Sequence, residues 1–137
     1  MTAEIRATIV KAKDVTPFRR GNGVETALLI GRERGAARFT SGLTSFPPDS
    51  GAPFHCHNCD EQVTVLSGSA RVEVGGQTDT LGPHDSTFIP AGLYHRFVNT
   101  GREPLVILWI YDADHVTRTF QETGVTVTHL SGGDTVV

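Results

Sequence analysis

The sequence predicts an all-β domain of the sandwich or barrel type, and three observations support this prediction. Glycine and proline recur through the middle of the chain and divide it into short runs rich in Val, Thr, Ile and Phe. Several of these runs alternate between polar and apolar residues, as a strand with one buried face does. No window of about 11 residues or more carries a sustained helical stripe. Short strands with regularly spaced turns are typical of sandwiches and barrels.

Individual segments support the strand prediction. Residues 61–66 mix polar and apolar side chains, and residues 70–74 alternate as Ala, Arg, Val, Glu, Val. The pair Gly75-Gly76 that follows is typical of a two-residue hairpin turn. We therefore expect a strand in each run and a hairpin after the second.

Residues 105–111 are apolar on both parities, which predicts a strand covered on both faces. We expect the second cover to come from another copy of the chain in a homodimer; a fully buried central strand of a monomer is the alternative. Residues 112–123 are expected to hold one short helix or turn, and residues 132–135 a loosely held chain end.

Composition and charge argue against several functional classes. The chain has 137 residues, 38% of them apolar, which suits one folded domain. Its net charge of -3, without a basic run, argues against nucleic-acid binding. The longest apolar stretch, residues 105–111, is far short of the ~20 residues that cross a bilayer. The N-terminus lacks the apolar run of a secretory signal, so we expect a cytoplasmic protein without membrane partners.

Three histidines and one glutamate are spaced as ligands of a single metal ion. In a strand, residues two apart point to the same face, so His55 and His57 converge, and Glu61 keeps their parity. His95 lies far downstream and can join them from a neighbouring strand. Imidazole and carboxylate ligands suit Fe, Mn, Ni, Cu or Zn and leave coordination positions open for water or substrate. We therefore expect these four residues to bind one divalent transition metal.

The other histidines and the two cysteines have simpler interpretations. Each of the three proposed ligand histidines alone could be a packing or surface residue, and only the joint pattern with Glu61 indicates a metal. His84, His115 and His129 are expected at the surface. Cys56 and Cys59 form a CxxC pair, for which a zinc knuckle or a redox pair is the alternative. No second CxxC and no HxxxH is present, so we expect two thiols, with Cys56 facing away from the histidines and Cys59 on their side.

Two stretches of the chain resemble the two motifs of the cupin family. Residues 53–61 (PFHCHNCDE), followed by Gly68, are similar to the first motif, HxHxxxE with a glycine after six more residues. Residues 90–99 (PAGLYHRFVN) are similar to the second, PxGxxHxxxN, at all four named positions. Two departures fall in turns: the opening glycine of the first motif is displaced to Gly51, and His84 stands where the second normally begins with glycine.

The resemblance implies a double-stranded β-helix, or jelly-roll barrel, with short N- and C-terminal extensions. It implies one cupin domain over residues 1–137, with a core at about 36–112, an N-terminal arm at 1–25 and a C-terminal extension at 113–137. The metal would lie inside the barrel. It would be held by the residues that match the motifs, namely His55, His57, Glu61 and His95. Gly68 and Gly92 would supply turn conformations, and Asn99 would be a strand-end or turn residue.

The chemistry of such a centre stays open between three classes. The leading hypothesis is a dioxygenase-like oxidoreductase, in which one metal, Fe first among the candidates, brings oxygen and a small organic substrate together. One alternative is an isomerase, cyclase or lyase that uses the metal as a Lewis acid. The other is a non-catalytic sensor or ligand-binding module. In the enzymatic versions Glu61 could also accept a proton during turnover.

Six side chains are candidates for lining the substrate pocket, because they share the parity of the ligands or are large and apolar. They are Cys59, Val63, Val65, Phe97, Phe46 and Trp109. No Ser-His-Asp arrangement, nucleophile elbow or phosphate-binding glycine loop occurs in the chain. We therefore expect a small-molecule substrate and neither covalent hydrolysis nor nucleotide chemistry.

Overall fold

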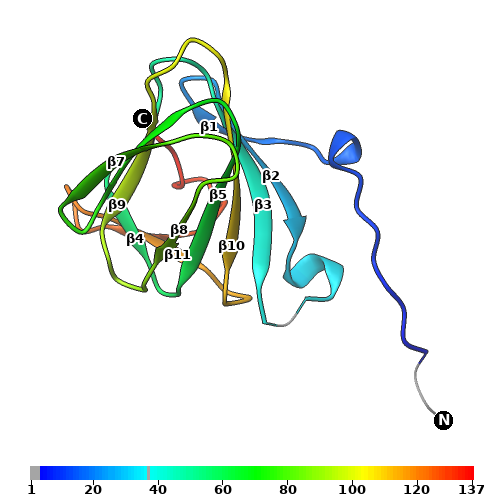
Figure 1. The fold of residues 1–137 in the computed structure, drawn as a ribbon. Helices are drawn as coiled ribbons and strands as arrows, with labels where there is room; N and C mark the ends of the chain where they lie inside the picture. The colour runs from blue at the N-terminus through cyan, green and yellow to red at the C-terminus, as the bar shows by residue number, and fades with distance from the viewer. Residues whose placement is uncertain (1–3, 37) are drawn as a thin grey trace.

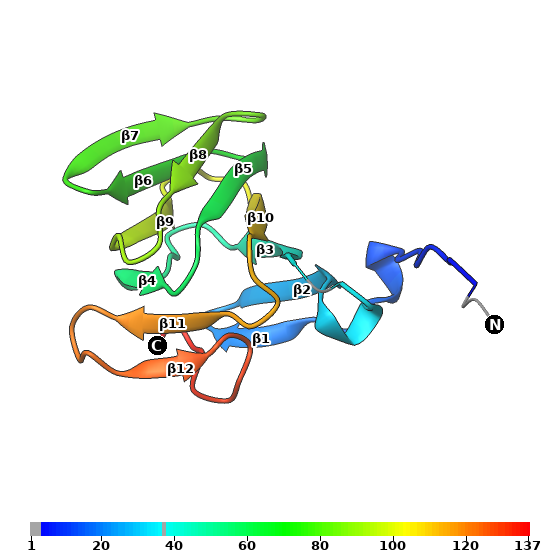
Figure 2. The same ribbon diagram turned by 90° about the horizontal axis from the view of Figure 1, so that it is seen from below.

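Two six-stranded antiparallel sheets face each other in the computed structural model, which describes residues 4–36 and 38–137 (Figures 1 and 2). In spatial order, the first sheet contains β1 (Phe18–Gly21), β2 (Val24–Ile30), β3 (Thr40–Phe46), β10 (Leu105–Tyr111), β5 (Glu61–Ser67) and β8 (Ser86–Ile89). The second contains β12 (Thr126–Thr128), β11 (Thr117–Phe120), β4 (His55–His57), β9 (His95–Asn99), β6 (Ala70–Val74) and β7 (Gln77–Leu81). Two single-turn 3-10 helices, η1 (Ala12–Asp14) and η2 (Arg32–Arg34), precede β1 and β3. The predicted all-β jelly roll is confirmed.

The strands predicted from alternation are present, together with the predicted turn. Residues 61–66 lie in β5, and residues 70–74 form β6, which pairs with β7 through a hairpin. Gly75 and Gly76 at its tip have φ of 54° and 79°. Positive φ at both central residues is what a type I′ hairpin requires, and glycine adopts it without steric cost.

β10 is a central strand of the first sheet, hydrogen-bonded to β3 on one side and to β5 on the other. Its inward side chains are buried in the core: Leu105, Ile107, Trp109 and Tyr111. Its outward side chains are half-buried: Val106, Leu108 and Ile110. The single chain therefore covers β10 fully on one face only, and the homodimer contact expected on the other face stays a prediction.

The short helix expected within residues 112–123 is not formed, so that alternative is wrong. Residues 117–120 form β11, which pairs with β4 on one side and β12 on the other. The β-branched Thr117 and Thr119 suit this ladder, and Arg118 between them is buried. A helix here would leave this edge of β4 without its hydrogen bonds, so tertiary pairing decides the structure of the segment.

Both ends of the chain contribute strands to the barrel. β1 and β2 form one edge of the first sheet, and β11 and β12 form one edge of the second. Residues ahead of β1 run outward from the sheet edge (Figure 1), and residues 1–3 of the expected arm lie outside the described residues. The end expected to be loosely held is anchored instead, because the side chain of Asp134 is fully buried. Within the described part of the chain, no helix has the length and apolar character needed to cross a membrane.

Gly68 occupies a turn where both the backbone angle and the available space require glycine. Its φ is 83°, and a Cβ placed there would lie 2.5 Å from the carbonyl oxygen of Pro104 and 2.9 Å from Cα of Leu105. Gly92 also has a positive φ, of 80°, but nothing lies within 4 Å of its Cβ position. The turn roles expected of the two motif glycines agree with these angles.

We predict that Gly68→Ala destabilises the protein more than Gly76→Ala. Both positions have a similar positive φ, but a Cβ at Gly76 would meet nothing within 4 Å. The backbone angle alone costs an alanine about 1–2 kcal/mol at either position, and the clash with residues 104 and 105 adds to this only at Gly68. Urea unfolding of both variants measures the difference. Equal losses of unfolding free energy would contradict the packing argument.

Candidate metal centre

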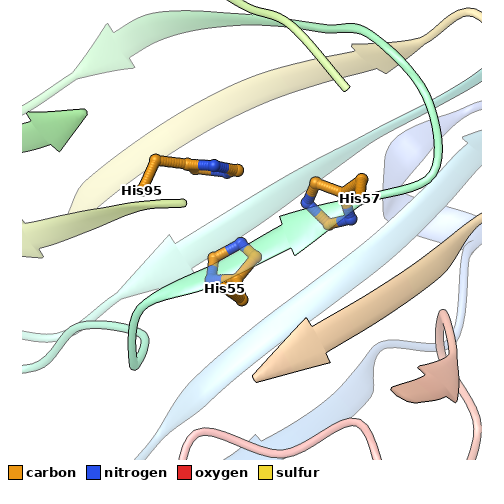
Figure 3. A group of neighbouring side chains, drawn as sticks. All are labelled: His55, His57 and His95. Carbon is orange, nitrogen blue, oxygen red and sulfur yellow. The ribbon is translucent and has the colours of Figure 1, made fainter. Parts of the chain in front are cut away.

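The three motif histidines meet in the interior between the sheets. His55 and His57 lie on β4, and His95 lies on β9 directly opposite His55 in the ladder. Figure 3 shows the two β4 imidazoles on the same face of the strand, with the ring of His95 facing them. One nitrogen of each ring lies within 4.8 Å of the corresponding nitrogens of the other two. All three residues are at least 95% buried, with 5%, 5% and 1% of their surface exposed.

Backbone carbonyls fix which nitrogen of each ring carries the proton. The Nδ1 atoms lie at hydrogen-bond distance from carbonyl oxygens: His55 from Pro53 (2.7 Å), His57 from Thr117 (3.0 Å) and His95 from Leu93 (2.9 Å). A carbonyl can only accept, so each Nδ1 donates its N–H and, in the neutral ring, leaves a lone pair on Nε2. This second contact is the one that orients histidines in metal sites.

Burial keeps the β4 imidazoles in this neutral form. Desolvation lowers the pKa of His57 to about 4, although the nearby Glu61 carboxylate raises it. Desolvation and the positive charge of Arg118 lower the pKa of His55 well below 6.5. At neutral pH, protons therefore do not compete with a metal ion for these two Nε2 lone pairs.

Glu61, the first residue of β5, reaches the same point from the facing sheet. Its Oε1 lies 3.2 Å from Nε2 of His95 and 3.6 Å from Nε2 of His57. Burial raises the pKa of Glu61, but His95, His57 and Arg118 outweigh this and lower it, so the carboxylate is ionised. Oε1 is buried without a hydrogen-bond partner among the described residues. An ionised oxygen facing imidazole lone pairs needs a shared cation, and three nitrogens with one oxygen fit a divalent transition metal.

A small cavity adjoins the cluster, and four of the six expected pocket residues line it. Its volume is about 30 Å³, room for about two water molecules. The lining includes Val63, Phe97, Phe46 and Trp109. Val65 is fully buried further along β5, beyond the cavity, and Cys59 is buried in the core outside the lining. Burial and the carboxylates of Asp112, Glu61 and Asp60 raise the pKa of the Cys59 thiol to about 12, so it stays protonated.

Sequence reasoning missed four polar side chains of this cavity: Tyr111, Arg118, Arg20 and Thr44. The hydroxyl of Tyr111 lies 3.3 Å from Nε2 of His57 and donates to that lone pair. Burial and Glu61 raise the pKa of Tyr111 well above 10, so it keeps its proton. Its parity with Trp109 on β10 is a signal that could have identified it. Arg118 lies in the segment expected to be helical, where parity could not be applied.

One further expectation is corrected and two others agree with the structure. His129 is not a simple surface residue, because its ring packs edge-on against Trp109 and Tyr111 with centroids 5.0 and 5.2 Å away. His84 and His115 are exposed, as expected.

Asn99 is fully buried and holds its turn by donating to the carbonyls of Phe46 and Glu103 and accepting from the amide of Gly101, as expected of a structural residue. Cys56 and Cys59 are buried free thiols.

Comparison with known proteins agrees with the geometry. Residues 42–111 match the family model described as Cupin domain. The chain belongs to the cupin family. This cupin is 31% identical over 101 residues to the polyketide synthase CurC of Streptomyces cyaneus, covering 73% of the chain and 66% of CurC, just under two thirds of its length. It is 33% identical over 99 residues to protein SchB of Streptomyces halstedii, covering 72% of each.

Two solved structures have the same fold as this cupin. The polyketide cyclase RemF from Streptomyces resistomycificus aligns with a TM-score of 0.72 at 24% identity, over 94% of this chain and 89% of RemF. Oxalate decarboxylase from Bacillus subtilis, described with Mn(II) centres, aligns with a TM-score of 0.71 at 25% identity, over 80% of this chain and 31% of that chain. Together with the three-histidine cluster, the cupin neighbour with Mn(II) centres supports a site for a divalent metal.

We predict that His57→Ala removes metal binding and lowers thermal stability. The change deletes one Nε2 ligand and the Nδ1 contact that ties β4 to the carbonyl of Thr117. His115→Ala is the matched control, because that side chain is exposed. Elemental analysis gives the metal content and thermal unfolding gives Tm. Unchanged metal content in His57→Ala would contradict the assignment.

We also predict that the metal-free protein loses stability as the pH falls from 7 to 5. The pKa of His57 is about 4 in the folded state and 6.5 when unfolded, so between these values the unfolded state binds the extra proton. This one group contributes of the order of 3 kcal/mol over the full window, and His55 and His129 act in the same direction. Urea unfolding of chelator-treated protein at both pH values tests this. A free energy of unfolding that is flat or rises on acidification would be incompatible with it.

Proposed function

We propose that this protein is a metal-dependent cyclase that closes rings in a polyketide substrate by carbon–carbon bond formation. The observation that carries the proposal is the set of three buried imidazoles that face one ionised carboxylate at a small cavity. The names of CurC and RemF favour this reading over the dioxygenase hypothesis, which has no such support among the relatives named above. A cyclase belongs to the alternative in which the metal acts as a Lewis acid and oxygen is not used.

The proposed reaction is an intramolecular aldol condensation. A methylene flanked by two carbonyls loses a proton, and its carbon attacks a carbonyl carbon of the same chain. The attacked oxygen takes up that proton and becomes a hydroxyl. The attacking carbon then loses its second proton, and the hydroxyl leaves with a proton as water while the ring gains a C=C bond. Atoms and electrons balance without an oxidant, so oxygen is not consumed. A bound divalent metal would polarise the carbonyl that is attacked or enolised.

The residues of the cavity have distinct roles in this scheme. Glu61 is ionised and can accept the methylene proton. Tyr111 is protonated and its hydroxyl already donates inside the cavity, so it can donate to an enolate oxygen. The histidines His55, His57 and His95 would hold the metal together with Glu61. The apolar wall formed by Val63, Phe97 and Trp109 excludes bulk water from the enolate.

We expect metal-loaded protein to convert a linear poly-β-ketone into a cyclised product one water lighter, at the same rate with and without oxygen. Because the step needs no redox change, Zn and Mn should support it as well as Fe. Mass spectrometry of anaerobic and aerobic reactions measures this. A product that contains added oxygen and forms only in air would restore the dioxygenase reading. Spectral changes of the bound metal without turnover would favour a binding module.

In the same assay Tyr111→Phe should lower kcat about 10²-fold without loss of bound metal, since the hydroxyl acts on the substrate oxygen. Tyr94→Phe is the matched control, because Tyr94 does not line the metal cavity. Equal rates for wild type and Tyr111→Phe would exclude the proposed donor.

A further inference from the structure

The last residues of the chain form part of the cavity wall. After β12 the chain turns back toward β1 (Figure 1). The amide of Val136 donates to the carbonyl of Arg20 (2.9 Å), and the side chain of Val137 fills the space beside Gly21. Val136 lines the metal cavity, and every other lining residue except Ala52 lies on a strand. Residues 131–137, the C-terminal tail, are therefore the part of the wall that can move without breaking a sheet.

Asp134 fastens this tail to two buried arginines. Its carboxylate, fully buried, lies 3.2 Å from Nη1 and Nη2 of Arg20 and 2.9 Å from Nε of Arg118. It also accepts from the amide of Leu130 (2.8 Å). Arg20 and Arg118 are 3% and 5% exposed, and both line the metal cavity.

The two guanidinium groups have more binding capacity than Asp134 uses. Nε of Arg20 is buried without a hydrogen-bond partner among the described residues. Nε of Arg118 has only its 2.9 Å ion pair with Asp134, which lacks hydrogen-bond alignment, and Nη2 of Arg20 also lies 3.1 Å from Nε2 of His129. Burial and Arg118 lower the pKa of Arg20 to about 10, so it remains charged at neutral pH. Two buried cations thus share the Asp134 carboxylate at close range, and the second negative charge in the cavity is that of Glu61.

Charge balance at the cavity indicates an anionic ligand. Arg20 and Arg118 are balanced by Asp134 and Glu61 while no metal is bound. A divalent metal would leave two uncompensated positive charges in a water-poor interior, which attracts an anion. Exchange of Asp134 for a ligand of one negative charge leaves this balance unchanged, so a ligand with more than one anionic oxygen is favoured. The enolate or phenolate formed in the proposed cyclisation carries the opposite charge, and planar guanidinium groups suit such oxygens.

Volume indicates how such a ligand would reach the metal. The cavity has room for about two waters and for no organic substrate. On the other side of the tail lies a groove of about 820 Å³, a size typical of ligand sites. Its lining is largely apolar and includes Phe54, Phe120, Val125 and Val127. Val136 lines both spaces, so it separates them.

We propose that Arg20 and Arg118 form the binding site for the anionic oxygens of the substrate, and that the Asp134 carboxylate occupies this site until the substrate displaces it and the tail. The apolar rings of the substrate would lie in the groove. The nature of the anion rests on the proposed function, whereas the displacement of the tail does not.

A reversible tether tests the movement of the tail without changing any charge. The Cβ position of Gly133 lies 3.7 Å from Cβ of Val127, a distance suited to a disulfide, and residue 133 directly precedes Asp134. In Zn-loaded Val127→Cys/Gly133→Cys, we expect the oxidised form to lose metal to dipicolinate at least tenfold more slowly than the form reduced by a phosphine. Equal release rates in the two redox states would overturn the proposed displacement.

Salicylate, an aromatic carboxylate, probes the arginine pair itself. Asp134→Asn removes the negative charge that competes for the arginines, and should bind salicylate at least tenfold more tightly than wild type in calorimetry of the Zn-loaded protein. Asp114→Asn is the matched control, because it removes the same charge from an exposed pair with Arg32 (3.1 Å). The double variant Asp134→Asn/Arg118→Lys keeps the positive charge at position 118 but lacks the planar guanidinium group. Its salicylate affinity should return to the wild-type value. Unchanged salicylate affinity in folded Asp134→Asn would show that Asp134 only holds the tail in place, and would contradict the proposed anion site.

The tether is intended to retain the native contacts of the tail and thus decides the question even if Asp134→Asn does not fold. Neither measurement uses ring closure. If the tether slows metal release and Asp134→Asn binds salicylate more tightly but no cyclisation is found, only the proposed function is overturned. If cyclisation is found but neither of the other two effects, only the tail proposal is overturned.

Discussion

The site depends on three hydrogen bonds from imidazole Nδ1 atoms to backbone carbonyls. They fix the tautomer of each ring: those of His55 and His95 are local, and that of His57 to Thr117 exists because β4 pairs with β11. The Nε2 atoms of His57 and His95 lie 3.6 and 3.2 Å from Oε1 of Glu61, which has no donor among the described residues. A cation is the group that such an arrangement lacks, and the barrel supplies its ligands from both sheets.

The same interior has a second polar system that faces the first. Arg20, Arg118 and Asp134 connect the first sheet, the second sheet and the chain end at one point. The positive charge of Arg118 helps to lower the pKa of His55 and of Glu61, and so helps to keep the imidazole neutral and the carboxylate ionised. The proposed binding of an anionic substrate would thereby be linked electrostatically to the metal site, with the C-terminal tail between that cavity and the apolar groove.

Local sequence patterns predicted the parts of the fold that local physics controls. Alternation predicted β5 and β6, and the Gly75-Gly76 pair predicted the hairpin turn that joins β6 to β7. Strand parity predicted that His55 and His57 lie on the same face. Long-range pairing was beyond such reasoning. β11 is a strand because β4 offers it an edge, and Asp134 is buried because two arginines from distant strands meet there. The sequence pattern of residues 112–137 indicates neither the pairing of β11 with β4 nor the burial of Asp134.

The most direct test of the metal centre is X-ray absorption spectroscopy of the Zn-loaded protein. The structure predicts a shell of three imidazole nitrogens and carboxylate oxygen at about 2.0–2.2 Å, with no sulfur scatterer. A sulfur shell at about 2.3 Å would assign the ion to Cys56 or Cys59, and fewer than three imidazoles would contradict the convergence of His55, His57 and His95 on one ion.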